Sequence, residues 1–234
     1  MALNTLKRVD NLIRKRLKSN FFLVKYGLFS TSADDVIIER KDSIGIIKLN
    51  NPKEKNCLKQ SMINKISTTL DEWNGDNNLQ LVILKAADHE FFSVGGAADS
   101  FVKLAKEPQH STQYFAETYK FIYKFCTFNV PTVALVNGIM ASSGATLAAN
   151  CTYRVVSEKA GFSLPEVTYG FIPDDGASYY LSRESGRLGF YLALTGQQIS
   201  KRDLVTAGIA THFVTSAGME NLETALLAAK LDHS

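Results

Sequence analysis

Short apolar strands alternate with helical segments along most of this chain, and that alternation restricts it to the α/β class. Apolar runs on either side of a charged turn predict a β-hairpin over 36–49, and the helical spacing of apolar residues over 61–73 predicts a helix after it. Further strands are expected at 81–84, 133–136, 155–156 and 162–163. Further helices are expected near 98–105, 114–125, 143–149, 177–183, 188–195 and 202–207. No repeat or linker interrupts this pattern, so we expect one domain.

The start of the chain differs from the remainder in charge. Its first 29 residues contain seven basic residues and one acidic residue, which leaves 19 basic and 22 acidic residues elsewhere. Apolar residues recur every three or four positions over 3–17, with basic residues between them. This pattern is typical of a mitochondrial targeting segment, although a solvated basic helix or a partner-binding patch also fits it. We predict that residues 1–32 direct the chain to the mitochondrial matrix and that residues 33–234 form the folded domain.

Composition excludes several classes of function. The region after the leader is mildly acidic, which gives no electrostatic footprint for nucleic acid. No apolar run approaches the roughly 18 residues that a membrane span needs. The cysteines Cys57, Cys126 and Cys151 are widely spaced, so we expect neither a disulfide framework nor a metal site.

Two glycine-rich segments are candidates for main-chain binding of a ligand. Gly95 and Gly96 follow an apolar strand end, where glycine permits a sharp turn and a close approach to a ligand, although taken alone this pair fits an ordinary turn better. The second segment, 137–146, runs from a strand through small residues into a helix. Free N–H groups at a helix start suit a developing oxyanion, whereas the alternative is a turn packed tightly for steric reasons.

A third segment, 164–177, carries acids among apolar residues. Glu166 and Asp174 lie eight positions apart in a loop with two prolines and two glycines. Acids in such surroundings have altered proton affinity, which general acid–base catalysis requires. Alternatively, Asp174 or Asp175 caps the helix that begins near Gly176.

Together these segments resemble the crotonase (enoyl-CoA hydratase/isomerase) superfamily, and within it the hydrolases of 3-hydroxyisobutyryl-CoA in valine breakdown. The resemblance covers about 36–214 and is carried by these segments and by 177–183, 192–196 and 207–213. It implies a spiral of ββα units with two perpendicular sheets wrapped by helices. It also implies an acyl-CoA substrate, no cofactor other than the coenzyme A of that substrate, and allows for a homo-oligomer.

The resemblance also implies roles for individual residues. The amides of Gly96 and Ser143 would hold the thioester oxygen, and Glu166 would act as nucleophile or as base for water. Asp174 would orient a substrate hydroxyl or shuttle a proton. Glu117 and Thr118 fall where the hydrolases have a substrate-side glutamate, and Thr146 replaces the second glutamate of hydratases.

The sequence departs from the family pattern at Ala97, Ser142 and Ser143, which stand where acidic or glycine residues are usual. Relatives also continue beyond the equivalent of Ser234 through further helices. Two alternatives to a thioester hydrolase therefore remain open. One is a non-catalytic structural subunit, as in mitochondrial ribosomes, and the other is an enoyl-CoA hydratase or isomerase.

Overall fold

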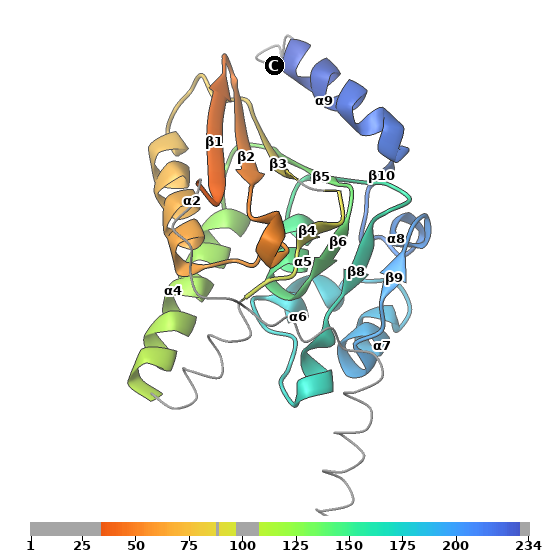
Figure 1. The fold of residues 1–234 in the computed structure, drawn as a ribbon. Helices are drawn as coiled ribbons and strands as arrows, with labels where there is room; N and C mark the ends of the chain where they lie inside the picture. The colour runs from red at the N-terminus through yellow and green to blue at the C-terminus, as the bar shows by residue number, and fades with distance from the viewer. Residues whose placement is uncertain (1–33, 88, 97–107, 230–234) are drawn as a thin grey trace, which may run out of the picture. The chain divides into compact units, whose positions relative to one another are not determined.

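The computed structural model describes residues 34–87, 89–96 and 108–229 (Figure 1). Its larger sheet has the strand order β1-β2-β3-β5-β7-β10. These strands are β1 (Val36–Lys41), β2 (Ile44–Leu49), β3 (Leu81–Ala86), β5 (Thr132–Val136), β7 (Tyr153–Val156) and β10 (His212–Phe213). β1 and β2 form the antiparallel hairpin, whereas every other neighbouring pair in this sheet is parallel. The expected leader, Ala97 and the expected helix near 98–105 lie outside the described residues.

A second sheet has the order β4-β6-β8-β9. Its strands are β4 (Phe91–Ser93), β6 (Ile139–Ala141), β8 (Gly161–Ser163) and β9 (Ile199–Ser200). The pairs β3/β4, β5/β6 and β7/β8 each give one strand to the larger sheet and the next strand to the smaller sheet. Successive units along the chain therefore repeat the same arrangement of two strands, one in each sheet. This confirms the α/β class and the spiral of ββα units.

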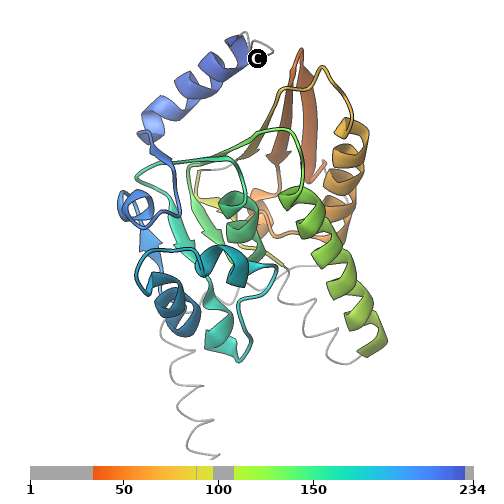
Figure 2. The same ribbon diagram turned by 180° about the vertical axis from the view of Figure 1, so that it is seen from behind.

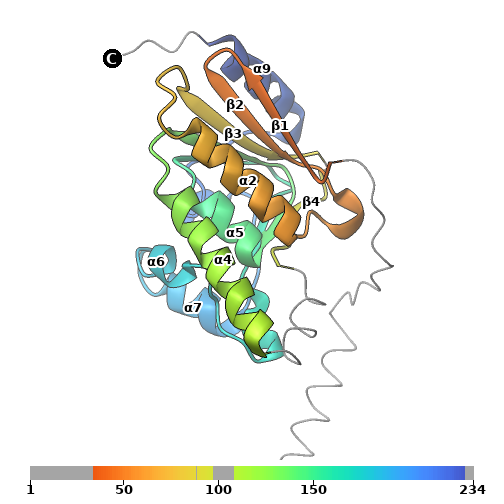
Figure 3. The ribbon, with the colours of Figure 1, turned by 90° about the vertical axis from the view of Figure 1, so that its left-hand side faces the viewer.

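Helices occupy the intervals between the strands. They are η1 (Pro52–Glu54), α2 (Gln60–Trp73), α4 (Pro108–Cys126), α5 (Ser142–Ala149), η2 (Pro165–Tyr169), α6 (Ala177–Leu181), α7 (Leu188–Thr195), α8 (Asp203–Thr206), η3 (Ser216–Gly218) and α9 (Met219–Ala228). Figure 3 shows α2 and α4 side by side, and the view from behind in Figure 2 shows α5 next to α4. The expected helices within the described residues are confirmed, whereas α9 was not expected.

The period-two alternation of β3 divides the core between the two faces of the larger sheet. Val82 and Leu84 belong to the main apolar cluster, which includes side chains of α2, α4 and α5. Leu81 and Ile83 face the opposite way, into a smaller cluster that Met219 of α9 completes. Both faces are covered, as expected for a mostly parallel sheet, and α5 lies within the main core.

Candidate active site

The first turn of α5 follows directly from the end of β6. Ala141 is still extended, with φ −139° and ψ 156°, and Ser142 then takes a positive φ of 52°. Such a φ is uncommon for a residue with a side chain and turns the backbone sharply. The first four N–H groups of a helix have no acceptor within it, and no side chain caps this helix. The amide of Ser143 is therefore suited to bind an oxygen that carries negative charge.

The Gly95–Gly96 turn approaches this helix start closely. Gly95 has a φ of +84°, and a Cβ built on it would lie 2.7 Å from the Ser143 nitrogen and 2.6 Å from the Ser142 Cβ. Only glycine fits this position without a shift of the backbone. Gly96 and Ser143 consequently border the same hollow, although they are 47 positions apart in the sequence. The remaining residues that line it are Leu58, Ile63, Tyr114, Thr118, Phe121 and Ile122.

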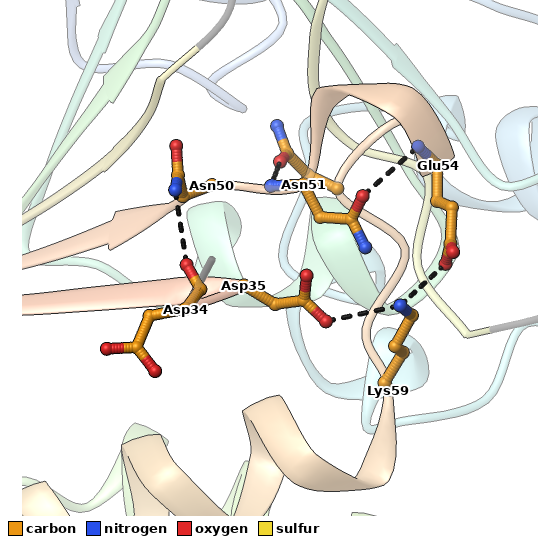
Figure 4. A network of polar contacts seen from close by, with 7 residues as sticks. Asp34, Asp35, Asn50, Asn51, Glu54 and Lys59 are labelled. Carbon is orange, nitrogen blue, oxygen red and sulfur yellow. Dashed lines mark hydrogen bonds and ion pairs between the residues drawn. The ribbon is translucent and has the colours of Figure 1, made fainter. Parts of the chain in front are cut away.

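A polar network holds the 50–59 loop together and ties it to the residues just before β1 (Figure 4). Lys59 Nζ lies 3.1 Å from Asp35 Oδ2 and 3.0 Å from Glu54 Oε2, and Asn51 Oδ1 accepts the N–H of Glu54. The Leu58 N–H then donates to the Gly95 carbonyl at 2.8 Å. The loop therefore fixes the main chain that presents Gly96 to the hollow.

The fully buried Asn56 ties the same loop to β4. Its side chain accepts the N–H of Asn51 at 2.8 Å and donates to the Phe91 carbonyl at 2.9 Å. The Ser93 hydroxyl in turn donates to the Asn56 carbonyl at 2.8 Å. These contacts satisfy buried polar groups on both segments, so the loop and β4 are held in register.

Glu166 lies on the short helix η2 and is 2% exposed. The Ser142 hydroxyl donates a hydrogen bond to its Oε1 at 2.5 Å, so the carboxyl reaches the start of α5. Burial raises the pKa of Glu166, and the hydrogen bond from Ser142 offsets part of that rise. Among the described residues, Oε2 of this carboxyl has no hydrogen-bond partner. A buried carboxyl with one unpartnered oxygen is suited to take a proton from a substrate or a water molecule.

Asp174 is half-buried at the loop before α6. Its Oδ2 accepts a hydrogen bond of 3.2 Å from the hydroxyl of Tyr119 on α4. Burial raises the pKa of Asp174, and the Tyr119 bond offsets part of that rise. Burial, together with the charge of Asp174, raises the pKa of Tyr119 to about 12. An ionised carboxylate has lone pairs beyond the one that Tyr119 uses, so Asp174 can accept a further hydroxyl.

Asp175 does not cap α6, contrary to one of the two sequence-based alternatives. The helix has no side-chain cap, and the N–H of its first residue, Ala177, bonds to the main-chain carbonyl of Asp174. Asp175 is 5% exposed and accepts a short hydrogen bond from the Ser143 hydroxyl. Burial and the neighbouring charge of Asp174 raise the pKa of Asp175 to about 7.

The two remaining expected residues differ in their placement. Thr118 is buried, lines the hollow, and donates its hydroxyl to the Tyr114 carbonyl at 3.0 Å. Glu117 does not line the hollow, and its Oε1 accepts a bond of 2.9 Å from Gln113 one turn earlier on α4. Thr146, which replaces the second hydratase glutamate, lies with its hydroxyl 3.3 Å from that of Tyr180. The structure therefore brings Thr118 to the hollow and leaves Glu117 outside its lining.

The described part of the chain contains no group of three His, Cys, Asp or Glu side chains placed to hold a metal ion. No helix over those same residues is both long and apolar enough to cross a bilayer. Gly96, Ser143 and the hydroxyl-bearing Thr118 and Tyr114 line the hollow. The carboxyls of Glu166 and Asp175 bond to the side chains of the first two residues of α5. Such a set can polarise a carbonyl, stabilise the oxyanion formed on it and transfer protons.

This combination of fold and site defines a class of protein. The sequence profile of the enoyl-CoA hydratase/isomerase family matches residues 44–234, and the chain belongs to this family. Among solved structures, an enoyl-CoA hydratase from Rhodobacter sphaeroides superposes with a TM-score of 0.79 at 30% identity, covering 86% of this chain and 61% of that one. A carnitinyl-CoA dehydratase from Mycobacterium thermoresistibile superposes with a TM-score of 0.80 at 29% identity, and the match covers 84% of this chain and 58% of that one.

Several curated proteins are more similar to this chain in sequence than these two solved structures are. The mitochondrial 3-hydroxyisobutyryl-CoA hydrolase of Mus musculus is 39% identical over 201 residues, 86% of this chain and 52% of that protein. The Homo sapiens protein of the same name is 36% identical over 217 residues, 92% of this chain and 56% of that protein. The chain therefore spans about half the length of the relatives that it matches.

Sequence reasoning missed three side chains that take part in the site. The resemblance assigns a role to the Ser143 amide but none to the side chains of Ser142 and Ser143, whose hydroxyls bind Glu166 and Asp175. Tyr119 is exposed on α4 and its hydroxyl contacts Asp174, a role that no sequence motif indicates. The sequence did contain a signal for the serine contacts, because Ser142, Ser143 and Asp175 all occur within motifs that otherwise match the family.

Proposed function

We propose that this chain forms the catalytic site of an acyl-CoA thioester hydrolase acting on a short branched 3-hydroxyacyl-CoA of the 3-hydroxyisobutyryl-CoA type. The observation that carries the proposal is the meeting of Gly96 and Ser143 in one hollow, with Glu166 bonded to the same helix start. Family membership and the names of the mitochondrial relatives support the substrate class.

The proposed reaction begins when the thioester oxygen accepts hydrogen bonds from the amides of Gly96 and Ser143. A water molecule, deprotonated by Glu166, adds to the carbonyl carbon; alternatively, Glu166 attacks first and water cleaves the resulting anhydride. The tetrahedral oxyanion stays in the amide pair, for which losing one donor typically costs about 10² to 10³ in rate. Its collapse breaks the carbon–sulfur bond, and the departing thiolate of coenzyme A takes up a proton.

Asp174 gives this proposal its preference for a hydroxylated acyl group. Its carboxylate already accepts one hydroxyl, from Tyr119, and an ionised carboxylate has further lone pairs for a substrate hydroxyl. A site arranged for such a bond discriminates against an analogue that lacks the hydroxyl, because bound substrate then shields the carboxylate from water without replacing the lost hydrogen bond. Thr118, in the lining of the hollow, would contact the substrate from α4, and Glu117 would contribute at its rim.

The remaining expectations are part of the same proposal. The reaction uses water, amides and carboxyls, so it requires no metal or redox cofactor, and coenzyme A enters with the substrate. We place the protein in the mitochondrion because of the basic amphipathic pattern of residues 1–32 and the mitochondrial relatives. N-terminal sequencing of protein recovered from cells tests this, since an intact Met1 on cytosolic protein would contradict it.

Thiol release from acyl-CoA substrates tests the function directly. We expect purified protein to release free thiol from 3-hydroxyisobutyryl-CoA and to hydrate crotonyl-CoA negligibly, because Thr146 supplies no second carboxylate. Hydration without thiol release would instead favour a hydratase. A folded protein that performs neither reaction and assembles with other proteins would favour the non-catalytic subunit.

A further inference from the structure

Asp175 is a buried carboxyl that the mechanism above does not use. It is 5% exposed, and one of its oxygens accepts the Ser143 hydroxyl. Its other oxygen, Oδ1, has no hydrogen-bond partner among the described residues. Because the same serine contributes the proposed oxyanion amide, the Asp175 carboxyl lies only one side chain away from the position of the substrate oxygen.

The groups that face Asp175 increase the cost of a negative charge there. On its own loop these groups include Asp174, and η2 contributes the second buried carboxyl, Glu166. Three phenols also interact with it electrostatically: Tyr114 and Tyr119 of α4, and Tyr180 of α6. None of these groups is basic, so none of them would compensate an ionised Asp175. Burial and the charge of Asp174 accordingly raise the pKa of Asp175 to about 7.

We infer that Asp175 is a positioning residue that must be neutral for thioester hydrolysis, because its ionised form would place a negative charge beside the Ser143 amide that holds the oxyanion. This inference rests on the proposed function. It assigns the residue a role that differs from those of Glu166 and Asp174, which act on water and on the substrate hydroxyl.

The expected loss of rate can be estimated from the repulsion between two negative charges that are separated by one side chain. Two like charges about 5–6 Å apart repel strongly enough, at an effective dielectric constant of about 20, to slow a reaction by about 10²-fold. The neutral carboxyl removes this repulsion and retains its hydrogen bond with the Ser143 hydroxyl. Since Glu166, Asp174 and Asp175 interact, they titrate as a coupled group, and the productive form has a proton on Asp175 while Glu166 is free to accept one.

The first test compares kcat/KM for thiol release in the wild type and in Asp175→Asn, which is similar in shape and uncharged. We expect the ratio of the variant to the wild type to rise about tenfold or more between about pH 6.5 and about pH 8.5, because wild-type Asp175 ionises over this range. Glu158→Gln is the control, since Glu158 is an exposed carboxylate that accepts the Ser216 N–H at 2.8 Å. Its ratio to the wild type should stay constant.

The second test measures urea unfolding of the same proteins as a function of pH. A raised pKa means that the folded state binds more protons than the unfolded state between about pH 4 and about pH 7, so Asp175 lowers stability as the pH rises through this window. Asp175→Asn should therefore gain stability relative to the wild type across the window, and the difference should level off above it. A difference that does not change with pH would overturn the inference.

The two tests also separate this inference from the proposed function. Normal thiol release by the wild type with a parallel pH profile in Asp175→Asn would overturn the inference alone. Absence of thiol release from both proteins at every pH would overturn the proposed function and the inference with it.

Discussion

At the scale of single residues, the proposed preference for a hydroxylated acyl group rests on Asp174. We expect the wild type to cleave 3-hydroxyisobutyryl-CoA at least about tenfold faster than isobutyryl-CoA, because only the former satisfies the Asp174 carboxylate. Asp174→Ala should abolish this preference in a thiol-release assay. Tyr119→Phe is the matched control, since it removes the hydroxyl 3.2 Å from Asp174 but keeps the carboxylate. A preference that survives in Asp174→Ala would contradict the assignment.

Ser142 adjusts the proton affinity of Glu166. Its hydroxyl stabilises the ionised carboxylate, so Ser142→Gly should raise the pKa of Glu166 further above its ordinary range. Because Glu166 must be ionised to accept a proton, the acid limb of the rate profile should shift to higher pH, while alkaline rates converge with the wild type. Glycine suits the φ of +52°, which limits strain in the variant. A rate profile with an unmoved acid limb would argue against Glu166 as the base.

At the scale of secondary-structure elements, the contact between α5 and β4 determines the geometry of the hollow. A Cβ at Gly144 would lie 2.5 Å from the Ser93 carbonyl oxygen and 2.6 Å from the Ser93 Cβ. Gly144→Ala should therefore lower the free energy of unfolding by about 1–3 kcal/mol, the usual cost of overpacking.

The control for this prediction is Gly218→Ala, measured by the same denaturant titration. Its new methyl group would meet only the side chains of Val214 and Thr215, which can adjust. We expect a smaller loss of stability than for Gly144→Ala. Equal stability of the two variants would show that the α5–β4 contact tolerates more bulk than the geometry implies.

Most elements could be predicted from the sequence because their apolar periodicity is local. The hairpin over 36–49, α2 and β5 each have a clear pattern of buried residues and were confirmed. The helix α9 was not predicted, since its apolar face becomes apparent only against the cluster around Ile83 and Leu135. The division of β3 and β4 between two sheets also depends on pairing with strands far along the chain.

At the scale of the whole molecule, the site is assembled from segments that lie far apart in the sequence. The 50–59 loop, the Gly95–Gly96 turn, α4, the start of α5 and the 165–175 segment each contribute one side of it. The sequence motifs indicated three of these segments because each motif is continuous, and the family resemblance added α4, but no motif indicated the 50–59 loop. The motifs could not predict that Ser142 pairs with Glu166 and Ser143 with Asp175, since these contacts depend on how successive units of the spiral stack.

The central claim is that this assembled site hydrolyses a thioester with Glu166 as the group that attacks or activates water. Its most direct test is thiol release from 3-hydroxyisobutyryl-CoA by the wild type and by Glu166→Gln, which keeps the size of the side chain and removes its charge. We predict measurable release by the wild type and a loss of at least about 10² in the variant, with an unchanged unfolding midpoint. Equal turnover by the two proteins would contradict the claim.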